Sequence, residues 1–263
     1  MWWTVGGVLA LLWTVGFFLE RVIARQVRLA AEVERQEQMA LIGRMTSTLA
    51  HEIRNALGSV KGFAQLVDEK TPGSDPRKAG LAVVLQGAGR IEAIVNELLL
   101  FSREETYEAE AVDVAHLVRE VVRSDASTWG GAVDLSLPPE CIAKADREKL
   151  RRVLANGVRN SLQAMGDSGH LEISCLGMKR RIAIRIADTG PGIPPEETAR
   201  LFTPFHTTKT DGTGLGLAYS KKAVEGMGGR IDLSNGDGGG AVLTILLPAA
   251  EGDLHGEVRT DRR

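Results

Sequence analysis

The segment around His51 has the residue types for nucleophilic chemistry. Glu52 can accept a hydrogen bond from one imidazole nitrogen of His51, which leaves the other nitrogen with a free lone pair. Asn55 lies four residues after His51, so on a helix it shares that face and could hold a water molecule. The alternative is a solvated, charged helix face on which a histidine stands by chance.

Two further side chains suit a metal ion. Asn156 and Asn160 are four residues apart in a segment, 150–165, whose apolar residues recur at helical spacing, so both amides lie on one face. Amide oxygens are suitable ligands for Mg²⁺. The alternative is a pair of exposed polar positions, which the surrounding apolar stripe argues against.

The segment that ends at Asp188 could recognise a base. An apolar strand is expected over 182–188, and a carboxylate at its end can accept a hydrogen bond from an exocyclic amine. Gly190 and Gly192 follow directly and would let a flat base approach the backbone.

Lys209 and the glycines after it predict an anion site. Lys209 could reach a terminal phosphate as a point charge. Gly212, Gly214 and Gly216 lead into a helix expected to begin near Ala218, and such a helix start directs free N–H groups at phosphate. The run is neither a P-loop nor a Rossmann turn, because it lacks the Gly-Lys-Ser/Thr ending and the βαβ context.

The composition is that of an ordinary globular protein. The 263 residues are 43% hydrophobic and 25% charged with a net charge of −2, so no global field attracts nucleic acid. Aromatic residues make up 5%, which argues against base-stacking surfaces, and no direct nucleic-acid binding is expected. Cys141 and Cys175 are too few for a disulfide scaffold or a four-cysteine zinc site. We interpret them as small core residues in a reducing compartment.

Periodicity predicts the elements that position these residues. Two helical stripes, over 42–67 and 81–98, flank a turn segment at 71–76 and predict a helical hairpin. Because each stripe is narrow, two hairpins should pair into a dimeric four-helix bundle, which makes the protein a homodimer. After residue 106, helices with antiparallel strands predict an α+β two-layer sandwich. Its expected strands are 133–137, 171–176, 182–188 and 241–247, and Asp146 is the expected N-cap of the helix that carries Asn160.

Residues 1–19 contain no charged side chain and as a helix would extend about 28 Å. The arginines that follow, beginning with Arg21, place the rest of the chain in the cytoplasm by the positive-inside rule. We therefore expect one N-terminal transmembrane helix and no extracytoplasmic sensor domain. A cleaved signal peptide is the alternative, but the segment lacks a basic start and a small-residue cleavage site.

Five motifs together resemble the H, N, G1, F and G2 boxes of the sensor histidine kinases of two-component systems, in the family's order over roughly residues 40–248. They read AHEIRNALGSVKGFAQL, LANGVRNSLQAM, DTGPGIP, LFTPFHTTK and GTGLGLA. The short stretch between Lys209 and Gly212 is similar to that of the nitrogen-regulation and metal-stress subgroup.

The resemblance implies a domain order and a location. It implies a dimerisation and phosphoacceptor domain (40–105) and a catalytic ATP-binding domain of the Bergerat fold (110–248). The residues themselves predict the parts at either end: the transmembrane helix (1–19), a juxtamembrane signalling helix (20–39) and a polar, disordered tail (251–263). The protein would be a single-pass protein of the bacterial inner membrane with its catalytic part in the cytoplasm.

The resemblance also assigns roles in the phosphoacceptor domain. His51 would attack the γ-phosphate of ATP with Glu52 as orienting base, and the phosphoryl group would pass to an aspartate in the receiver domain of a response regulator. Glu52 and Asn55 would also serve dephosphorylation of that regulator. The family often has proline at position 56. This chain has Ala56, so the first helix should bend less there.

In the catalytic domain, Asn160 would coordinate Mg²⁺ with support from Asn156, and Asp188 would bind the adenine amine. The glycines would shape the pocket and lid: Gly190, Gly192, Gly212, Gly214 and Gly216. Two other functions are weighed. An ATPase of the same fold needs a glutamate where this chain has Asn156, and a non-enzymatic membrane scaffold would not need Asn160, Asp188 and the glycine loop intact.

Overall fold

The computed structural model describes residues 13, 16–22, 26, 52–73, 75–102, 106–138, 141–209 and 212–250. The chain divides into two compact units, Met1–Arg103 and Glu104–Arg263. Within the described residues, no helix combines the length and the apolar character needed to cross a bilayer. Most of the predicted 1–19 span, the 27–51 stretch that contains His51, and the 251–263 tail lie outside those residues.

The described part of the first unit contains a helical hairpin. Residues 52–70 are helical without a break at Ala56, and α2 follows over Arg77–Ser102. The two helices run antiparallel, because Arg54 donates to Asn96 at 2.8 Å and Lys61 pairs with Glu92 at 3.1 Å.

Small residues form the seam of this hairpin, and larger apolar residues stay outside it. Ala64, Ala88 and Val95 are buried. The first predicted stripe does not pack within the hairpin: Val60, Phe63 and Val67 are about half exposed or more. One hairpin therefore leaves an apolar face uncovered.

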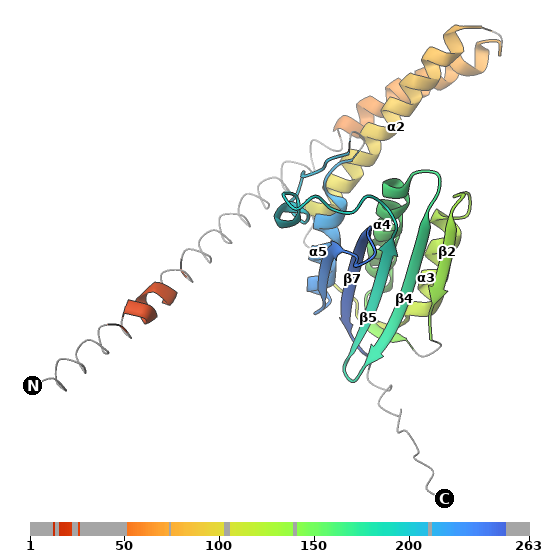
Figure 1. The fold of residues 1–263 in the computed structure, drawn as a ribbon. Helices are drawn as coiled ribbons and strands as arrows, with labels where there is room; N and C mark the ends of the chain where they lie inside the picture. Colours follow the sequence, from red (N-terminus) through yellow and green to blue (C-terminus); the bar gives the residue numbers. More distant parts are fainter. Residues whose placement is uncertain are drawn as a thin grey trace, which may run out of the picture. The chain divides into compact units, whose positions relative to one another are not determined.

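The second unit is an α+β sandwich (Figure 1). Its five-stranded sheet has the order β2-β4-β5-β7-β6, and a two-stranded sheet pairs β1 with β3. The strands are β1 (Glu110–Asp113), β2 (Ala132–Ser136), β3 (Ile142–Ala145), β4 (His170–Met178), β5 (Arg181–Asp188), β6 (Arg230–Asn235) and β7 (Ala241–Pro248). The helices are α3 (Val114–Asp125), α4 (Arg147–Met165), α5 (Gly216–Gly226) and a 3₁₀ turn, η1 (Thr198–Arg200).

One pairing differs from the antiparallel arrangement that the sequence predicts. β2 and β4 run parallel, whereas the other pairs are antiparallel. The chain between β2 and β4 contains β3 and α4, which supplies the long crossover that a parallel pair requires. The alternation of apolar residues shows which face of a strand is buried, but it does not show whether two neighbouring strands run parallel or antiparallel.

The core lies between the helices and one face of the main sheet, as the alternation of β5 predicts. Ile182, Ile184 and Ile186 are almost fully buried, and burial of each such side chain contributes about 1.5–3 kcal/mol. A Cβ at Gly157 would lie 2.8–2.9 Å from Leu243 and Ile186, so glycine lets α4 pack directly on the sheet.

Asp146 caps α4 as predicted. Its side chain accepts from the Lys149 backbone N–H at 3.1 Å, and its Oδ2 is 2.7 Å from the Lys149 ammonium. Burial raises the pKa of Asp146, but the hydrogen bonds from Lys149 and Glu108 outweigh it and hold the pKa below its ordinary value. The start of α4 is thereby fixed.

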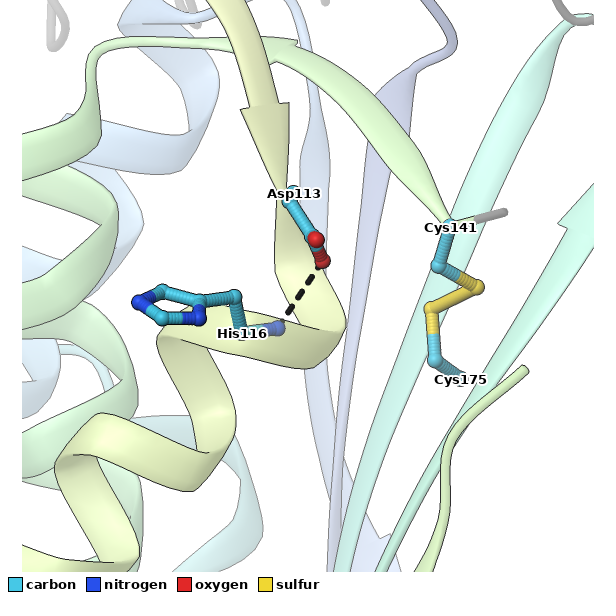
Figure 2. The surroundings of a disulfide bond; sticks show 4 residues. All are labelled: Asp113, His116, Cys141 and Cys175. Carbon is cyan, nitrogen blue, oxygen red and sulfur yellow. Dashed lines mark hydrogen bonds between the residues drawn. A yellow bond between two sulfur atoms is a disulfide. The ribbon is translucent and has the colours of Figure 1, made fainter. Parts of the chain in front are cut away.

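The interpretation of the cysteines as free core thiols is wrong in one respect. Cys141 and Cys175 are both buried, as expected, but they form a disulfide with Cα atoms 6.6 Å apart (Figure 2). Cys175 lies in β4, and the backbone carbonyl of Cys141 accepts a hydrogen bond from the Val114 N–H at the start of α3. The disulfide therefore links β4 to a residue that contacts α3. The two cysteines are 34 residues apart, and spacing alone does not show that the fold brings them together.

Candidate functional site

α4 is the element around which the predicted site residues gather. The structure brings the glycine segment at the start of α5, the loop that carries Lys209, and the loop after β5 into contact with successive turns of this helix. The contacts fall at Asn156, then at Asn160 and Gln163, then at Ala164. The segments that carry the predicted site residues of the second unit therefore all contact α4.

Asn156 ties α4 to α5. Its Nδ2 donates to Ser220 Oγ at 3.0 Å, and Ser220 Oγ donates to the Gly216 carbonyl at 3.0 Å. A Cβ at Gly216 would lie 2.4 Å from Asn156 Oδ1, so the first residue of α5 must be glycine for the helices to approach this closely. The geometry gives Asn156 a part in positioning α5.

The N-terminus of α5 has no side-chain cap. The helix begins at Gly216, two residues earlier than predicted, and its N-cap is Leu215, which has no side chain that can accept a hydrogen bond. The N–H groups of a first helical turn have no partner within the helix, and together with the helix dipole they suit an anion.

Lys209 reaches α4 from the segment before α5. Its ammonium donates to Asn160 Oδ1 at 3.2 Å and to Gln163 Oε1 at 2.9 Å. Burial lowers the pKa of this lysine, and the nearby Asp188 carboxylate opposes that change. The Lys209 ammonium therefore contacts Asn160 Oδ1, the same atom that is predicted to bind the metal ion.

Asp188 ends β5 with its side chain buried. Its Oδ1 accepts from the Gly190 N–H at 2.9 Å and from the Ala241 N–H at 3.1 Å. Within the described part of the chain both hydrogen bonds to this carboxylate end on Oδ1, which leaves Oδ2 for a ligand amine. The loop then passes over α4, since a Cβ at Gly190 would lie 3.2 Å from Ala164 Cβ.

The hairpin formed by β6 and β7 holds the loop that follows Asp188 in place. Asn235 accepts from the Ile193 N–H at 2.7 Å and donates to the Ile193 carbonyl at 2.9 Å. Gly192 has a φ of +76°, and a Cβ there would lie 2.8 Å from Asn235 Oδ1. Gly240 leaves still less room, because a Cβ at that position would lie 1.7 Å from the Asp188 carbonyl oxygen.

The segment before α5 folds back on itself at Gly214. Phe205 donates its backbone N–H to the Gly214 carbonyl at 3.0 Å. Gly214 has a φ of +67°, and a Cβ there would lie 2.5 Å from the Phe205 carbonyl carbon. A Cβ at Gly212 would lie 2.4 Å from Thr207 Oγ1, and residues 210–211 are outside the described chain.

In the first unit, Glu52 and Asn55 are both exposed on the helix over 52–70. They are three residues apart and so share one face. His51 lies outside the described residues, and its predicted role stays a prediction.

Three polar residues of this site were not predicted: Gln163, Ser220 and Asn235. Gln163 lies three residues after Asn160 and shares its helix face, so the i, i+3 spacing could have revealed it. Ser220 and Asn235 act across 64 and 42 residues of chain, and no local pattern marks such contacts.

Comparison with known proteins agrees with this arrangement. Residues 145–251 match the family described as histidine kinase-, DNA gyrase B- and HSP90-like ATPase. Residues 41–106 match the His Kinase A (phospho-acceptor) domain. The two matches define a class of protein, with a helical phosphoacceptor region followed by an ATPase-type α/β unit.

Individual relatives point to the same class. The chain is 32% identical over 248 residues to the sensor histidine kinase ZraS of Klebsiella oxytoca, which covers 92% of this chain and 54% of ZraS. Full-length ShkA, solved in complex with AMPPNP, gives a TM-score of 0.66 at 28% identity over 79% of this chain and 46% of ShkA. ThkA, solved in complex with the response regulator protein TrrA, gives 0.61 at 27% identity over 82% of this chain and 64% of that chain.

The chain belongs to the sensor histidine kinases of two-component systems. It spans about half the length of the curated relatives that it matches. The expected helical region and α/β ATP-binding fold are confirmed, and the N-terminal transmembrane helix stays a prediction.

Proposed function

We propose that this chain binds ATP in the second unit, transfers its γ-phosphoryl group to His51, and passes that group to an aspartate in the receiver domain of a response regulator. The observation that supports this most is the gathering of three ligand-binding features on α4. These are the Asp188 carboxylate, the Lys209 ammonium and the uncapped start of α5, which match the adenine and phosphate groups of a nucleotide.

The chain's own residues have distinct tasks in this proposal. Asp188 Oδ2 accepts a hydrogen bond from the adenine amine, while Lys209 and the first N–H groups of α5 hold the phosphates. A lone pair of His51 attacks the γ-phosphorus. The new P–N bond replaces the P–O bond to ADP, which leaves. Glu52 holds the ring proton and orients the imidazole.

The onward step breaks the P–N bond, and the carboxylate of the regulator takes the phosphoryl group. Glu52 and Asn55 are exposed on one helix face, where they can hold a water molecule that hydrolyses the regulator's acyl phosphate. The same face would then serve both the kinase and the phosphatase reactions.

The donor set fits Mg²⁺. Asn160 Oδ1 already accepts from a cationic group, the Lys209 ammonium, and an amide oxygen is a ligand that Mg²⁺ prefers. Asn160 would hold the ion together with phosphate oxygens, and the ion would neutralise charge on the triphosphate. Asn156 has its amide on Ser220 and would support the site by fixing α5.

Asn156 also argues against ATP hydrolysis as the main reaction. An ATPase of this fold would need a general base at this position to activate water, and an amide is not a base. Asn156 moreover donates its amide N–H to Ser220, which in turn donates to the Gly216 carbonyl. A protein nucleophile such as His51 removes the need for a base there.

Two further parts of the proposal concern assembly and location. The exposed Val60, Phe63 and Val67 give the hairpin an apolar face that a second hairpin could cover, which favours a homodimeric four-helix bundle. Residues 1–19, followed by Arg21, would anchor the chain as a single-pass inner-membrane protein with its catalytic part in the cytoplasm.

The test is incubation of the purified chain with γ-labelled ATP and Mg²⁺, beside His51→Gln and Asn160→Asp variants. We expect an acid-labile, base-stable label on the unaltered chain and none on His51→Gln, with ATP binding retained by that variant. The labelled chain should lose its label to a purified receiver domain of its cognate regulator. Label that survives in His51→Gln would overturn the assignment of the phosphoacceptor.

A further inference from the structure

Gln163 is a polar residue of the site to which the proposed reaction gives no task. It follows Asn160 by three residues on α4, so the two amides lie on the same helix face. Both direct their oxygens at one group, the Lys209 ammonium, at 3.2 Å from Asn160 and 2.9 Å from Gln163. The shorter of the two contacts is the one to Gln163.

The backbone around Lys209 prepares this contact. The Lys209 N–H donates to Thr207 Oγ1 at 3.1 Å, and the Gly212 N–H donates to the Lys209 carbonyl at 3.2 Å. The start of the side chain is therefore held by a local turn, and its end is held by two amides. An ammonium has three N–H donors, so two face α4 and the third can meet a phosphate oxygen.

We propose that Gln163 is a positioning residue that holds the Lys209 ammonium on Asn160 as a built-in counter-cation, which a divalent metal ion must displace when it binds with ATP. The inference rests on the proposed ATP site and deepens it. Lys209 and Mg²⁺ would then compete for one amide oxygen. Without metal, the held ammonium would neutralise part of the triphosphate charge.

This arrangement predicts a specific pattern of nucleotide affinity. Loss of the Gln163 acceptor releases the Lys209 ammonium from Asn160. Metal-free ATP should then bind more weakly, because the ammonium no longer neutralises its charge. ATP with Mg²⁺ should bind less weakly by comparison, because the ammonium no longer competes with Mg²⁺ for Asn160 Oδ1. The ratio of the ATP dissociation constant in EDTA to that in Mg²⁺ should therefore rise. A purely structural role for Gln163 would weaken binding equally under both conditions and leave the ratio unchanged.

The experiment measures ATP binding to the full chain by isothermal titration calorimetry, in EDTA and in Mg²⁺. Gln163→Met keeps the length of the side chain and removes the acceptor. Gln86→Met, at an exposed position of α2, is the matched control. Because neither Gln163 nor Lys209 belongs to the buried core, the variants should fold, and the melting temperature checks this.

We expect Gln163→Met to raise the ratio at least threefold, Gln86→Met to leave it unchanged, and Gln163→Met to have no further effect in a Lys209→Met background. An unchanged ratio, or additive effects of the two substitutions, would overturn the inference while leaving the ATP site intact. Absence of ATP binding by the unaltered chain would instead contradict the proposed function itself.

Discussion

Asp188→Asn tests whether the buried carboxylate recognises the adenine amine. Two backbone N–H groups donate to Asp188 Oδ1, at 2.9 and 3.1 Å. In the variant the amide oxygen should occupy this acceptor position, because the NH₂ group cannot accept. The NH₂ group then faces the adenine amine, donor against donor, so the substitution inverts the chemistry at the ligand while it keeps the fold.

The size of the effect follows from the lost hydrogen bond. A hydrogen bond to a charged group contributes about 1.5–3 kcal/mol. At about 1.4 kcal/mol for each factor of ten, the ATP dissociation constant should rise about 12- to 140-fold. Inosine triphosphate carries an oxygen in place of the amine, so its affinity should fall much less, and the preference for ATP should shrink or reverse.

The assay is equilibrium binding of ATP and of inosine triphosphate to both proteins, with melting temperature as a check on folding. Asp232→Asn, at an exposed position of β6, removes the same charge and serves as the control. If Asp188→Asn weakens both nucleotides equally, or leaves ATP binding unchanged, the assigned role of this carboxylate is wrong.

Three further predictions follow from contacts of the second unit. Asn156→Ala removes a net 0.5–1.5 kcal/mol for the bond to Ser220 and should weaken ATP binding roughly 2- to 12-fold by calorimetry; unchanged affinity would contradict a role in fixing α5. Gly214→Ala forces a side chain into the left-handed region at about 1–2 kcal/mol, before any clash, so both the melting temperature and the ATP affinity should fall. Reduction of the Cys141–Cys175 disulfide, which links residues 34 apart, should cost about 3.8 kcal/mol of unfolding free energy, visible as a lower urea midpoint; equal midpoints for the oxidised and reduced chain would refute this.

Local patterns predicted the parts of the fold that depend on neighbouring residues. The alternation over 182–188 predicted a strand with one buried face, and the structure gives β5 over the same stretch. Asp146 was predicted as an N-cap from its place before a helical stripe, and it makes that hydrogen bond. These features are local because both sheet alternation and capping act within a few residues.

Features that depend on contacts between distant segments of the chain were not predicted. Nothing in the order of strands showed that β2 runs parallel to β4, and nothing marked Cys141 and Cys175 as a pair. Asn235 lies in another strand and holds Ile193, in the loop after Asp188, across 42 residues of chain. Such contacts depend on which distant segments the fold brings together. A short stretch of sequence carries no pattern that identifies its distant partner.

The candidate site shows the same division. The motifs located Asn160, Asp188 and Lys209, because each residue type suits a group of the nucleotide. They did not show that Lys209 donates to Asn160, or that Gln163 shares the contact. Residue chemistry thus predicted candidate site residues, whose roles stay predictions, and the structure shows how their side chains are held.

The most direct test of the proposed kinase reaction is to map the phosphorylated residue. The purified chain would be incubated with ATP and Mg²⁺, digested at neutral pH to protect a P–N bond, and analysed by tandem mass spectrometry. We expect a phosphoryl group on His51 and on no other residue. Phosphate on a different residue, or conversion of ATP to ADP and free phosphate with His51 unmodified, would contradict the proposal.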